Sequence, residues 1–429
     1  MNNDSVNISI LDYFANNKDS LGVPKIKNED WKILKEKYDK DEIRIALAEY
    51  ITSNDIPFPN KQISEDRLKK LFIKFCNTSM KDEYKDFDDV KERYNYRNTY
   101  GDKPLGVINK SHQFNDVSDY FQQNNRMKCS SHRHHAPMDL WKSKRRLQTM
   151  NWHFWRDGVM ENSDLDSKAF RTSFRLGTYT ATQFRPSVAK ALYEKHNAEN
   201  VLDTSCGWGD RLAGFYATRN TQLYVGCDPN PDVFEVYKKQ CIAYEQFMTG
   251  KTPTLIEKEN YFECVGKKTV KIWNLPSEDV DWTQYKNLFD LYFTSPPYFE
   301  TEKYATDTDK SENQSWSRYD SFDGWKYNFF FKVTKMVWPT IRKNGFMMIN
   351  IIEPAKRHNG GRHGLCDDMV DTFSRFDDCS YLGKIGMRMQ ARPNAEELAE
   401  VFIEPIWTFR KNNSNYEFND KVTLDQFFV

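Results

Sequence analysis

Residues 200–212 read Asn-Val-Leu-Asp-Thr-Ser-Cys-Gly-Trp-Gly-Asp-Arg-Leu. An apolar strand ends at an acid, Asp203, and a loop of small residues with two glycines leads into a predicted helix at 211–217. Glycines let a ligand approach the backbone closely, and the start of a helix carries a positive partial charge. No Gly-Lys-Ser/Thr follows, so this is not a phosphate loop, and the third glycine of the dinucleotide fingerprint is missing. The stretch therefore predicts another type of ligand-binding loop.

A second predicted strand, residues 222–227, ends in Asp228-Pro229-Asn230. In a doubly wound sheet, an acid roughly 20 residues past the glycines accepts hydrogen bonds from the ribose hydroxyls of an adenosine. Asp228 occupies about that position. The two loops together predict a site for a ligand that contains adenosine.

A third stretch, Thr294-Ser295-Pro296-Pro297-Tyr298, follows the apolar run 291–293. The prolines remove two N–H donors and fix φ at about −65°, so the turn offers hydrogen-bond acceptors with little flexibility. Tyr298 supplies a ring face on which a base can stack. These groups suit a flat heteroaromatic ring with an exocyclic amino group. Taken alone, the pentapeptide is also compatible with an ordinary strand-to-loop stop.

Together the three stretches resemble the class I S-adenosylmethionine-dependent methyltransferases, and within them the DNA amino-methyltransferases that act on cytosine N4 or adenine N6. The loop at 177–186 resembles a family element that closes over the methionine end of the cofactor. The resemblance covers roughly residues 170–411 and implies S-adenosyl-L-methionine as the cofactor. The residues implied to bind the target amino group, and thus to be catalytic, are Ser295, Pro296, Pro297 and Tyr298. Those implied to bind the cofactor are Thr180, Phe184, Asp203, Cys206, Gly207, Gly209, Asp228, Asn230, Glu278, Asp279 and Thr294.

From residue 171, predicted strands alternate with helices, which is the signature of a mostly parallel sheet. The candidate strands are 200–203, 222–227, 269–273, 289–294, 345–352 and 401–409. The resemblance implies an α/β fold with a Rossmann-like methyltransferase sheet whose last strand is antiparallel. The regions that we expect are a mainly helical N-terminal domain of unknown role at 1–125, a basic and aromatic connecting segment at 126–170, the methyltransferase domain at 171–411, and a tail at 412–429.

Two further loops belong to the expected site. The loop after strand 269–273 contains Glu278 and Asp279, either of which could accept a hydrogen bond from the adenine amino group of the cofactor. The alternative is a helix start that Ser277 caps, with the acids in its first turn. Residues 300–324 form a charged loop with aromatic residues that is long enough to act as a lid.

The resemblance implies methyl transfer to the exocyclic amino group of a nucleic-acid base. The lone pair of such a nitrogen is delocalised into the ring. Hydrogen-bond acceptors on both amino hydrogens make this lone pair available for attack. Ser295 Oγ and the Pro296 carbonyl are the candidate acceptors, and no strong general base is needed because the methylated product is acidic. In the family that the chain resembles, serine at the first motif position is common among cytosine-N4 enzymes, so the resemblance favours DNA cytosine N4 over adenine N6. There are two alternatives. The substrate could be an RNA base, or the protein could be a catalytically inactive scaffold that binds nucleic acid.

A base must leave its stack to react, so a cationic surface should hold the nucleic-acid backbone. The candidate surfaces are the basic segment 126–146, followed by aromatic residues, and the glycine-containing loop 356–364. The segment could instead be a solvated helix face beside core tryptophans.

The composition is typical of a globular intracellular enzyme. Of 429 residues, 39% are hydrophobic and 15% aromatic, which excludes a disordered chain. The eight cysteines show no paired spacing, which favours a reducing compartment, and no apolar run approaches a membrane span. We expect a cytoplasmic protein, at the nucleoid or, if viral, in the host cytoplasm. The run from Cys129 to His135 has spacing compatible with zinc but lacks a second ligand pair, so no metal site is predicted.

Overall fold

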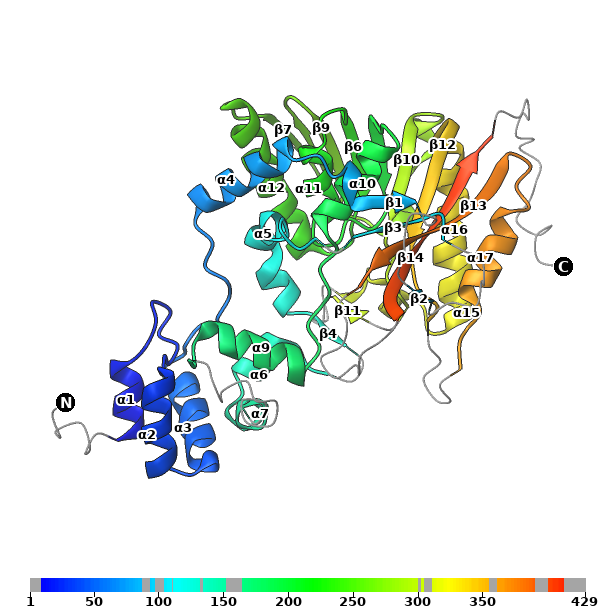
Figure 1. Ribbon diagram of the computed structural model, residues 1–429. Helices are drawn as coiled ribbons and strands as arrows, with labels where there is room; N and C mark the ends of the chain where they lie inside the picture. Colours follow the sequence, from blue (N-terminus) through cyan, green and yellow to red (C-terminus); the bar gives the residue numbers. More distant parts are fainter. Residues whose placement is uncertain are drawn as a thin grey trace.

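The computed structural model describes residues 9–86, 93–96, 104–109, 111–131, 134–151, 164–299, 302–304, 311–354, 361–389 and 400–412. One large mixed sheet runs through the body of the molecule with helices packed against it, and a group of N-terminal helices lies to one side (Figure 1). Most of the tail expected at 412–429 and part of the connecting segment lie outside the described residues.

The order and direction of the central strands identify the fold. In spatial order they are β9 (Thr269–Trp273), β6 (Leu223–Cys227), β5 (Asn200–Asp203), β10 (Phe289–Thr294), β12 (Ile341–Asn350), β14 (Glu400–Lys411) and β13 (Cys379–Arg388). Neighbours from β9 to β12 are parallel, whereas β14 is antiparallel to both β12 and β13. The α/β fold with a Rossmann-like methyltransferase sheet and an antiparallel last strand is therefore confirmed.

Successive residues of the strands face two different cores, as the pleat of a sheet requires. Val201 and Leu291 pack into one core, and their neighbours Leu202 and Tyr292 pack into the other. Because both faces are covered, β6 and β10 are buried along nearly their whole length and do not alternate between buried and exposed residues.

Helices cover both faces of this sheet. The first core includes residues of α10 (Pro186–Lys195), α11 (Asp210–Ala217) and α12 (Pro231–Thr249). The second includes residues of α15 (Phe322–Trp325), α16 (Lys332–Val337) and α17 (Leu365–Phe373). A π-helical stretch at Lys326–Phe331 joins α15 to α16. Such stretches are frequent at functional sites.

Several strands that the sequence did not predict extend the sheet. A hairpin of β7 (Thr254–Lys258) and β8 (Tyr261–Val265) lies beyond β9. At the opposite edge, β3 (Gly106–Ile108) pairs with β13 and with β1 (Tyr84–Asp86), and β2 (Arg93–Tyr96) pairs with β14. Part of the N-terminal region is therefore built into the sheet.

The remaining N-terminal helices divide between two cores. A separate core joins α1 (Ile10–Asn16), α2 (Asn28–Lys37), α3 (Lys40–Ser53), α6 (Pro137–Trp141), α7 (Lys144–Met150) and α9 (Ser167–Gly177). In contrast, α4 (Glu65–Asn77) and α5 (Asp116–Met127) pack on α11 and α12 of the sheet unit, where Phe72 stacks on Tyr244 at 4.4 Å. Helices on both sides of the expected boundary at residue 125 thus share the separate core.

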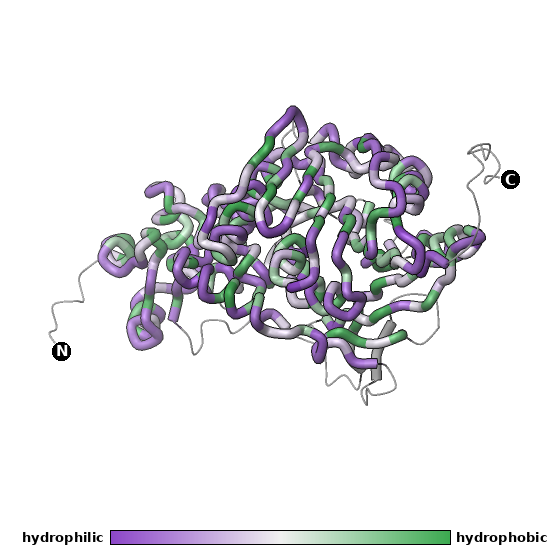
Figure 2. The backbone as a smooth tube through the Cα atoms, turned by 90° about the horizontal axis from the view of Figure 1, so that it is seen from above, coloured by the Kyte–Doolittle hydropathy of each residue, from purple (hydrophilic) through white to green (hydrophobic). Residues whose placement is uncertain are grey.

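Hydrophobic and hydrophilic stretches alternate along much of the chain (Figure 2). This alternation is what amphipathic elements around several cores require. Across the described ranges, none of the helices combines the length and the apolar character needed to cross a bilayer.

Candidate active site

The loops after β5, β6, β9 and β10 surround a cavity of about 670 Å³. Ligands of doubly wound sheets bind at this edge, outside the carboxyl ends of the strands. The predicted residues that line the cavity are Phe184, Cys206, Gly207, Asp228, Asn230, Glu278, Ser295, Pro296, Pro297 and Tyr298. The structure thus places the glycine loop and the Pro-Pro-Tyr turn around one continuous space.

Three predicted cofactor residues, Thr180, Gly209 and Asp279, are not part of this lining. Gly209 precedes α11 at φ +68°, and a Cβ there would lie 2.3 Å from Gln240 Oε1. Both the backbone conformation and the packing at position 209 therefore require a glycine. Asp279 is exposed and forms an ion pair with Arg318 at 2.8 Å, so its carboxylate is engaged at the surface.

Asp203 and Thr294 lie buried beneath the cavity and do not line it. The Asp203 carboxylate accepts from Arg211 Nε at 2.7 Å, from the Tyr224 hydroxyl at 2.7 Å and from Thr294 Oγ1 at 3.0 Å. It also accepts from the backbone N–H of Ser205 at 3.1 Å. These partners come from the glycine loop, α11, β6 and β10, so Asp203 fixes the elements that carry the site.

Asp228 lies at the end of β6 and faces the glycine loop. Its two oxygens accept from the backbone N–H groups of Gly207 at 2.9 Å and Asn230 at 3.0 Å. Burial raises the pKa of Asp228 to about 6, and these hydrogen bonds oppose the rise. Oδ2 also lies 3.4 Å from the Tyr237 hydroxyl, whereas Oδ1 accepts only from Asn230 among the described residues and keeps a lone pair for a hydroxyl of a ligand.

Glu278 lies on a short 3₁₀ turn, Ser277–Asp279, after β9, and its side chain is buried. Ser277 does not cap this turn with its side chain, so the alternative of a serine-capped helix start is not observed. Glu278 Oε1 accepts from the Tyr319 hydroxyl at 2.8 Å and pairs with Arg318 at 3.1 Å. Its Oε2 is buried with no hydrogen-bond partner among the described residues. Burial raises the pKa of Glu278, and an amino donor from a ligand would satisfy the free oxygen.

Asp210 lines the cavity but was not predicted as a site residue. It is the first residue of α11, and its Oδ1 accepts from Ser118 Oγ and from Gln183 Nε2, the latter at 3.0 Å. Its Oδ2 is buried with no partner in the described part of the chain. Burial raises the pKa of Asp210 to about 7. One feature of the sequence could have identified Asp210 as a site residue: it is an acid directly after the second glycine, at the start of a helix.

The Pro-Pro-Tyr turn is anchored by residues from two other strands. The Tyr298 hydroxyl donates to Glu404 Oε1 on β14 and lies 3.3 Å from the Asn350 carbonyl oxygen on β12. Burial and the adjacent Glu404 carboxylate raise the pKa of Tyr298 well above its usual value. Asn350 and Glu404 also line the cavity, and the sequence did not reveal them. The next residue, Phe299, has φ +53°, a strained conformation typical of functional turns.

The predicted lid contributes to the cavity through Tyr304, Asn313, Gln314 and Ser315. Residues 300, 301 and 305–310 of this lid lie outside the described residues. Beside Tyr304, β11 (Glu302–Lys303) pairs with β4 (Ser130–Ser131) of the basic segment. The lid and the basic segment are therefore joined.

The basic segment 126–146 contains two kinds of residue. Arg126, Lys128 and Lys144 form ion pairs with Asp119, Asp232 and Glu49. Lys142, Arg145 and Arg146 are exposed and form no ion pair with another described residue. Trp141 is buried in the N-terminal helical core, as the alternative of core tryptophans predicts. His132, Arg133 and the aromatic residues at 152–155 lie outside the described residues, as does most of loop 356–364.

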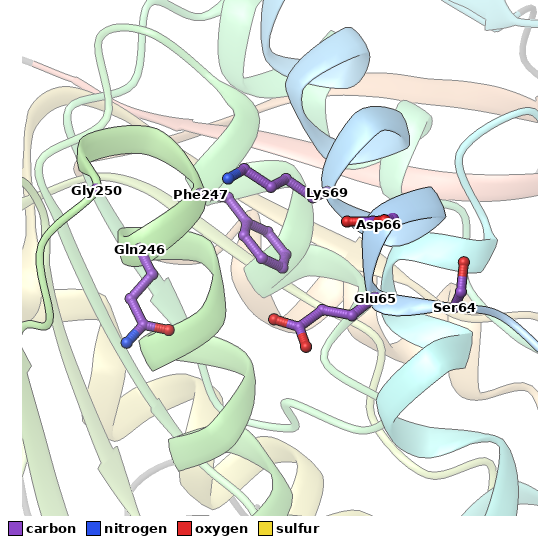
Figure 3. Close-up of a pocket in the computed structure, with 7 residues that line it drawn as sticks. All are labelled: Ser64, Glu65, Asp66, Lys69, Gln246, Phe247 and Gly250. Atoms are coloured by element: carbon purple, nitrogen blue, oxygen red, sulfur yellow. The ribbon is translucent and has the colours of Figure 1, made fainter.

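A second hollow of about 620 Å³ lies between α4 and α12 (Figure 3). Its lining residues are Ser64, Glu65, Asp66, Lys69, Gln246, Phe247 and Gly250. None of the predicted site residues takes part. Among the described residues, no three His, Cys, Asp or Glu side chains are grouped in a way that could hold a metal ion.

No protein-family model matches this chain, and no match was found among the curated proteins. Among solved structures, Trm1 from Pyrococcus horikoshii with S-adenosyl-L-methionine is 11% identical, with 54% of this chain and 57% of that chain covered and a TM-score of 0.31. TrmN from Thermus thermophilus is 10% identical, with 53% and 48% covered and a TM-score of 0.30.

The 1,6-didemethyltoxoflavin-N1-methyltransferase of Burkholderia thailandensis is 13% identical, with 53% of this chain and 78% of that chain covered and a TM-score of 0.29. Similarities this low support no conclusion about the activity of this chain. The fold assignment rests on the order and direction of the strands.

Proposed function

We propose that the protein is an S-adenosylmethionine-dependent methyltransferase that methylates an exocyclic amino group of a nucleic-acid base, with DNA cytosine N4 favoured over adenine N6. The observation that carries the proposal is the shared cavity. The glycine loop after β5 and the Pro-Pro-Tyr turn after β10 line the same space. A donor and an acceptor of a methyl group must meet in one place, and positioning supplies much of the rate enhancement.

The acids that face the cavity fit the donors of S-adenosylmethionine. The unpaired Oε2 of Glu278 would accept from the adenine amino group, and Asp228 would accept from the ribose hydroxyls. The unpaired Oδ2 of Asp210 would accept from the α-ammonium group. Gly207, at φ +58°, lets the backbone turn beside the ligand. When bound, this cofactor supplies a methyl group on a sulfonium centre.

The Pro-Pro-Tyr turn would hold the target base. Ser295 Oγ and the carbonyl oxygen of Pro296 would accept the two amino hydrogens and so free the nitrogen lone pair for attack. The Tyr298 ring, which Glu404 and Asn350 fix through its hydroxyl, would stack on the base. After methyl transfer, the positively charged nitrogen releases one proton to water.

Nucleic acid as the partner is supported by the exposed cations Lys142, Arg145 and Arg146 of the basic segment 126–146. In the same segment, β4 pairs with β11 of the lid, which supports a role for this segment beside the cavity. We include loop 356–364 in the proposed surface because it follows β12, whose last residue, Asn350, lines the cavity. An RNA base is the alternative substrate, because the turn binds an amino group irrespective of the sugar.

The decisive experiment incubates the protein with methyl-tritiated S-adenosylmethionine and separate pools of double-stranded DNA, single-stranded DNA and RNA. Mass spectrometry then identifies the labelled nucleoside. Label in N4-methylcytosine of DNA supports the proposal, label in N6-methyladenine changes the base, and label in RNA alone supports the alternative substrate. Absence of both label and calorimetric cofactor binding would contradict the proposal and leave the inactive scaffold.

The assigned roles predict a split between binding and turnover. Ser295→Ala and Tyr298→Ala should each lower kcat by about a hundredfold, because each removes a contact to the target base. Cofactor affinity should change by less than about threefold, because neither residue is assigned to the cofactor. Asp228→Ala is the matched control and should weaken cofactor binding. Equal losses of kcat and cofactor affinity in the Ser295 and Tyr298 variants would contradict these roles.

A further inference from the structure

Two polar side chains of the lid line the cavity without a hydrogen-bond partner. Gln314 is 5% exposed and Ser315 is 8% exposed. Gln314 Nε2 and Ser315 Oγ are buried, and neither atom has a partner among the described residues. Buried polar atoms in folded proteins are almost always hydrogen-bonded, so two adjacent exceptions that line a cavity indicate a polar ligand at this place.

Contacts of the lid place Gln314 at the end of the cavity that Glu278 occupies. Gln314 directly precedes α14 (Ser315–Arg318), and its carbonyl oxygen accepts from the backbone N–H of Arg318 at 3.0 Å. The two residues are therefore one helical turn apart, on the same side of the turn. Arg318 pairs with Glu278 at 3.1 Å, and the Tyr319 hydroxyl donates to the same carboxylate at 2.8 Å. These contacts fasten the lid to the loop after β9.

The unpaired atoms at this end are complementary to one edge of adenine. Glu278 Oε2 is a hydrogen-bond acceptor, and Gln314 Nε2 is a donor at every pH. Adenine has an amino group that donates and, on either side of it, a ring nitrogen that accepts, N1 or N7. An acceptor beside a donor therefore matches the amino group beside a ring nitrogen. A 6-oxo purine would instead turn a carbonyl acceptor towards the Glu278 carboxylate.

We propose that Gln314 is a specificity-determining residue for the cofactor, whose Nε2 donates to the adenine ring nitrogen N1 or N7 while Glu278 accepts from the amino group. The inference rests on the proposed function and adds a residue of the lid to its cofactor site. One 6-aminopurine then satisfies both unpaired atoms. The lid thus takes part in cofactor binding, at the adenine end of the cavity.

Calorimetry with S-adenosylhomocysteine, the demethylated cofactor, tests this inference independently of the target base. Two analogues replace one ring nitrogen by C–H, the 1-deaza and the 7-deaza form. We would measure Kd of all three ligands for the wild-type protein, Gln314→Met and Ser317→Ala. Methionine retains the length of glutamine and removes the donor. Ser317 is the matched control, because it belongs to the same helical turn, is exposed and lies outside the cavity lining. Thermal unfolding of each ligand-free variant, followed by circular dichroism, checks that it is folded.

The expected result is a loss of discrimination in one variant. Wild-type protein should bind at least one deaza analogue about tenfold more weakly than S-adenosylhomocysteine, because that analogue leaves the Gln314 donor unpaired. Gln314→Met should bind S-adenosylhomocysteine itself about tenfold more weakly and should bind that analogue equally well. Ser317→Ala should match the wild-type protein with all three ligands. The analogue that Gln314→Met no longer rejects identifies the ring nitrogen.

Other results would overturn the inference. Wild-type protein that binds all three ligands equally, or Gln314→Met with the wild-type discrimination against both analogues, would overturn it alone. The proposed methyl transfer stands in either case if the wild-type protein still labels a base. A wild-type protein that binds no S-adenosylhomocysteine and labels no base would overturn the proposed function as well.

Discussion

Asp203 illustrates how one buried carboxylate organises this site. An acid at the end of the first strand was expected to touch the cofactor, but Asp203 accepts from Arg211, Tyr224, Thr294 and Ser205 and lies beneath the cavity. Two of these donors, Arg211 and Ser205, line the cavity themselves. The carboxylate therefore supports the cavity indirectly, because it holds the glycine loop against β10 and α11.

Removal of this charge should destabilise the fold. Asp203→Asn leaves the Arg211 guanidinium, which is 4% exposed, without its buried counter-ion. Breaking such a pair costs about 3–5 kcal/mol of unfolding free energy, which urea denaturation measures. Glu49→Gln is the matched control, since it breaks the exposed Lys144 pair and should cost less than about 1 kcal/mol. Similar losses in both variants would show that Asp203 is not an organising residue.

The start of α11 brings an acid, a helix terminus and the loop at 177–186 together. Asp210 is the first helical residue, and Gln183 of that loop donates to it at 3.0 Å. A helix N-terminus favours a negative charge, yet burial dominates and raises the pKa of Asp210 to about 7. This element therefore contributes a titration near neutral pH.

The titration predicts how stability depends on pH. An unfolded aspartate titrates at about 4, so between about pH 4 and 7 the folded protein retains a proton that the unfolded chain has released. This carboxyl group therefore lowers stability as the pH rises through that range. Asp210→Asn lacks this titration and does not lose that stability. The unfolding free energy of the variant minus that of the wild type should therefore be more positive at pH 8 than at pH 5.

Urea denaturation of the ligand-free protein at both pH values measures this difference. The exposed Gln62 provides the control, because its side chain does not titrate and the effect of Gln62→Ala relative to wild type should not change between the two values. A pH-independent difference for Asp210→Asn would contradict the assigned titration.

The parts of the fold that the sequence predicted are local in the chain. Strands β5, β6, β9 and β10 end in loops whose glycines, acids and prolines are visible in a few consecutive residues, and the sheet brings these loops together. Strand β13 was missed because its two glycines and the buried Lys384 hide the apolar pattern.

Roles that depend on distant partners were not predictable. Glu404 lies 106 positions from Tyr298, and only the pairing of β14 with β12 brings it to the turn. The ion pair between Asp203 and Arg211 could not be predicted from the sequence for another reason. The sequence contains Arg211 eight positions later but does not indicate that its side chain turns back under the loop. Long-range contacts are set by packing, which a local pattern does not encode.

At the scale of the whole molecule, charge limits how nucleic acid could bind. The chain has 62 basic and 62 acidic residues, so there is no net positive charge to attract a polyanion. Affinity must come from a local surface. Within the basic segment, ion pairs engage Arg126, Lys128 and Lys144, which makes the exposed Lys142, Arg145 and Arg146 the candidates.

Combined substitution of Lys142, Arg145 and Arg146 by Ala should therefore weaken binding to nucleic acid. Each lost phosphate contact lowers the slope of log K against log salt by about one, so the triple variant should lose up to about three. Fluorescence anisotropy across a salt series measures this slope. Lys144→Ala should change it less, because Lys144 already pairs with Glu49 at 3.1 Å. An unchanged slope in the triple variant, with cofactor affinity retained, would move the nucleic-acid surface away from the basic segment.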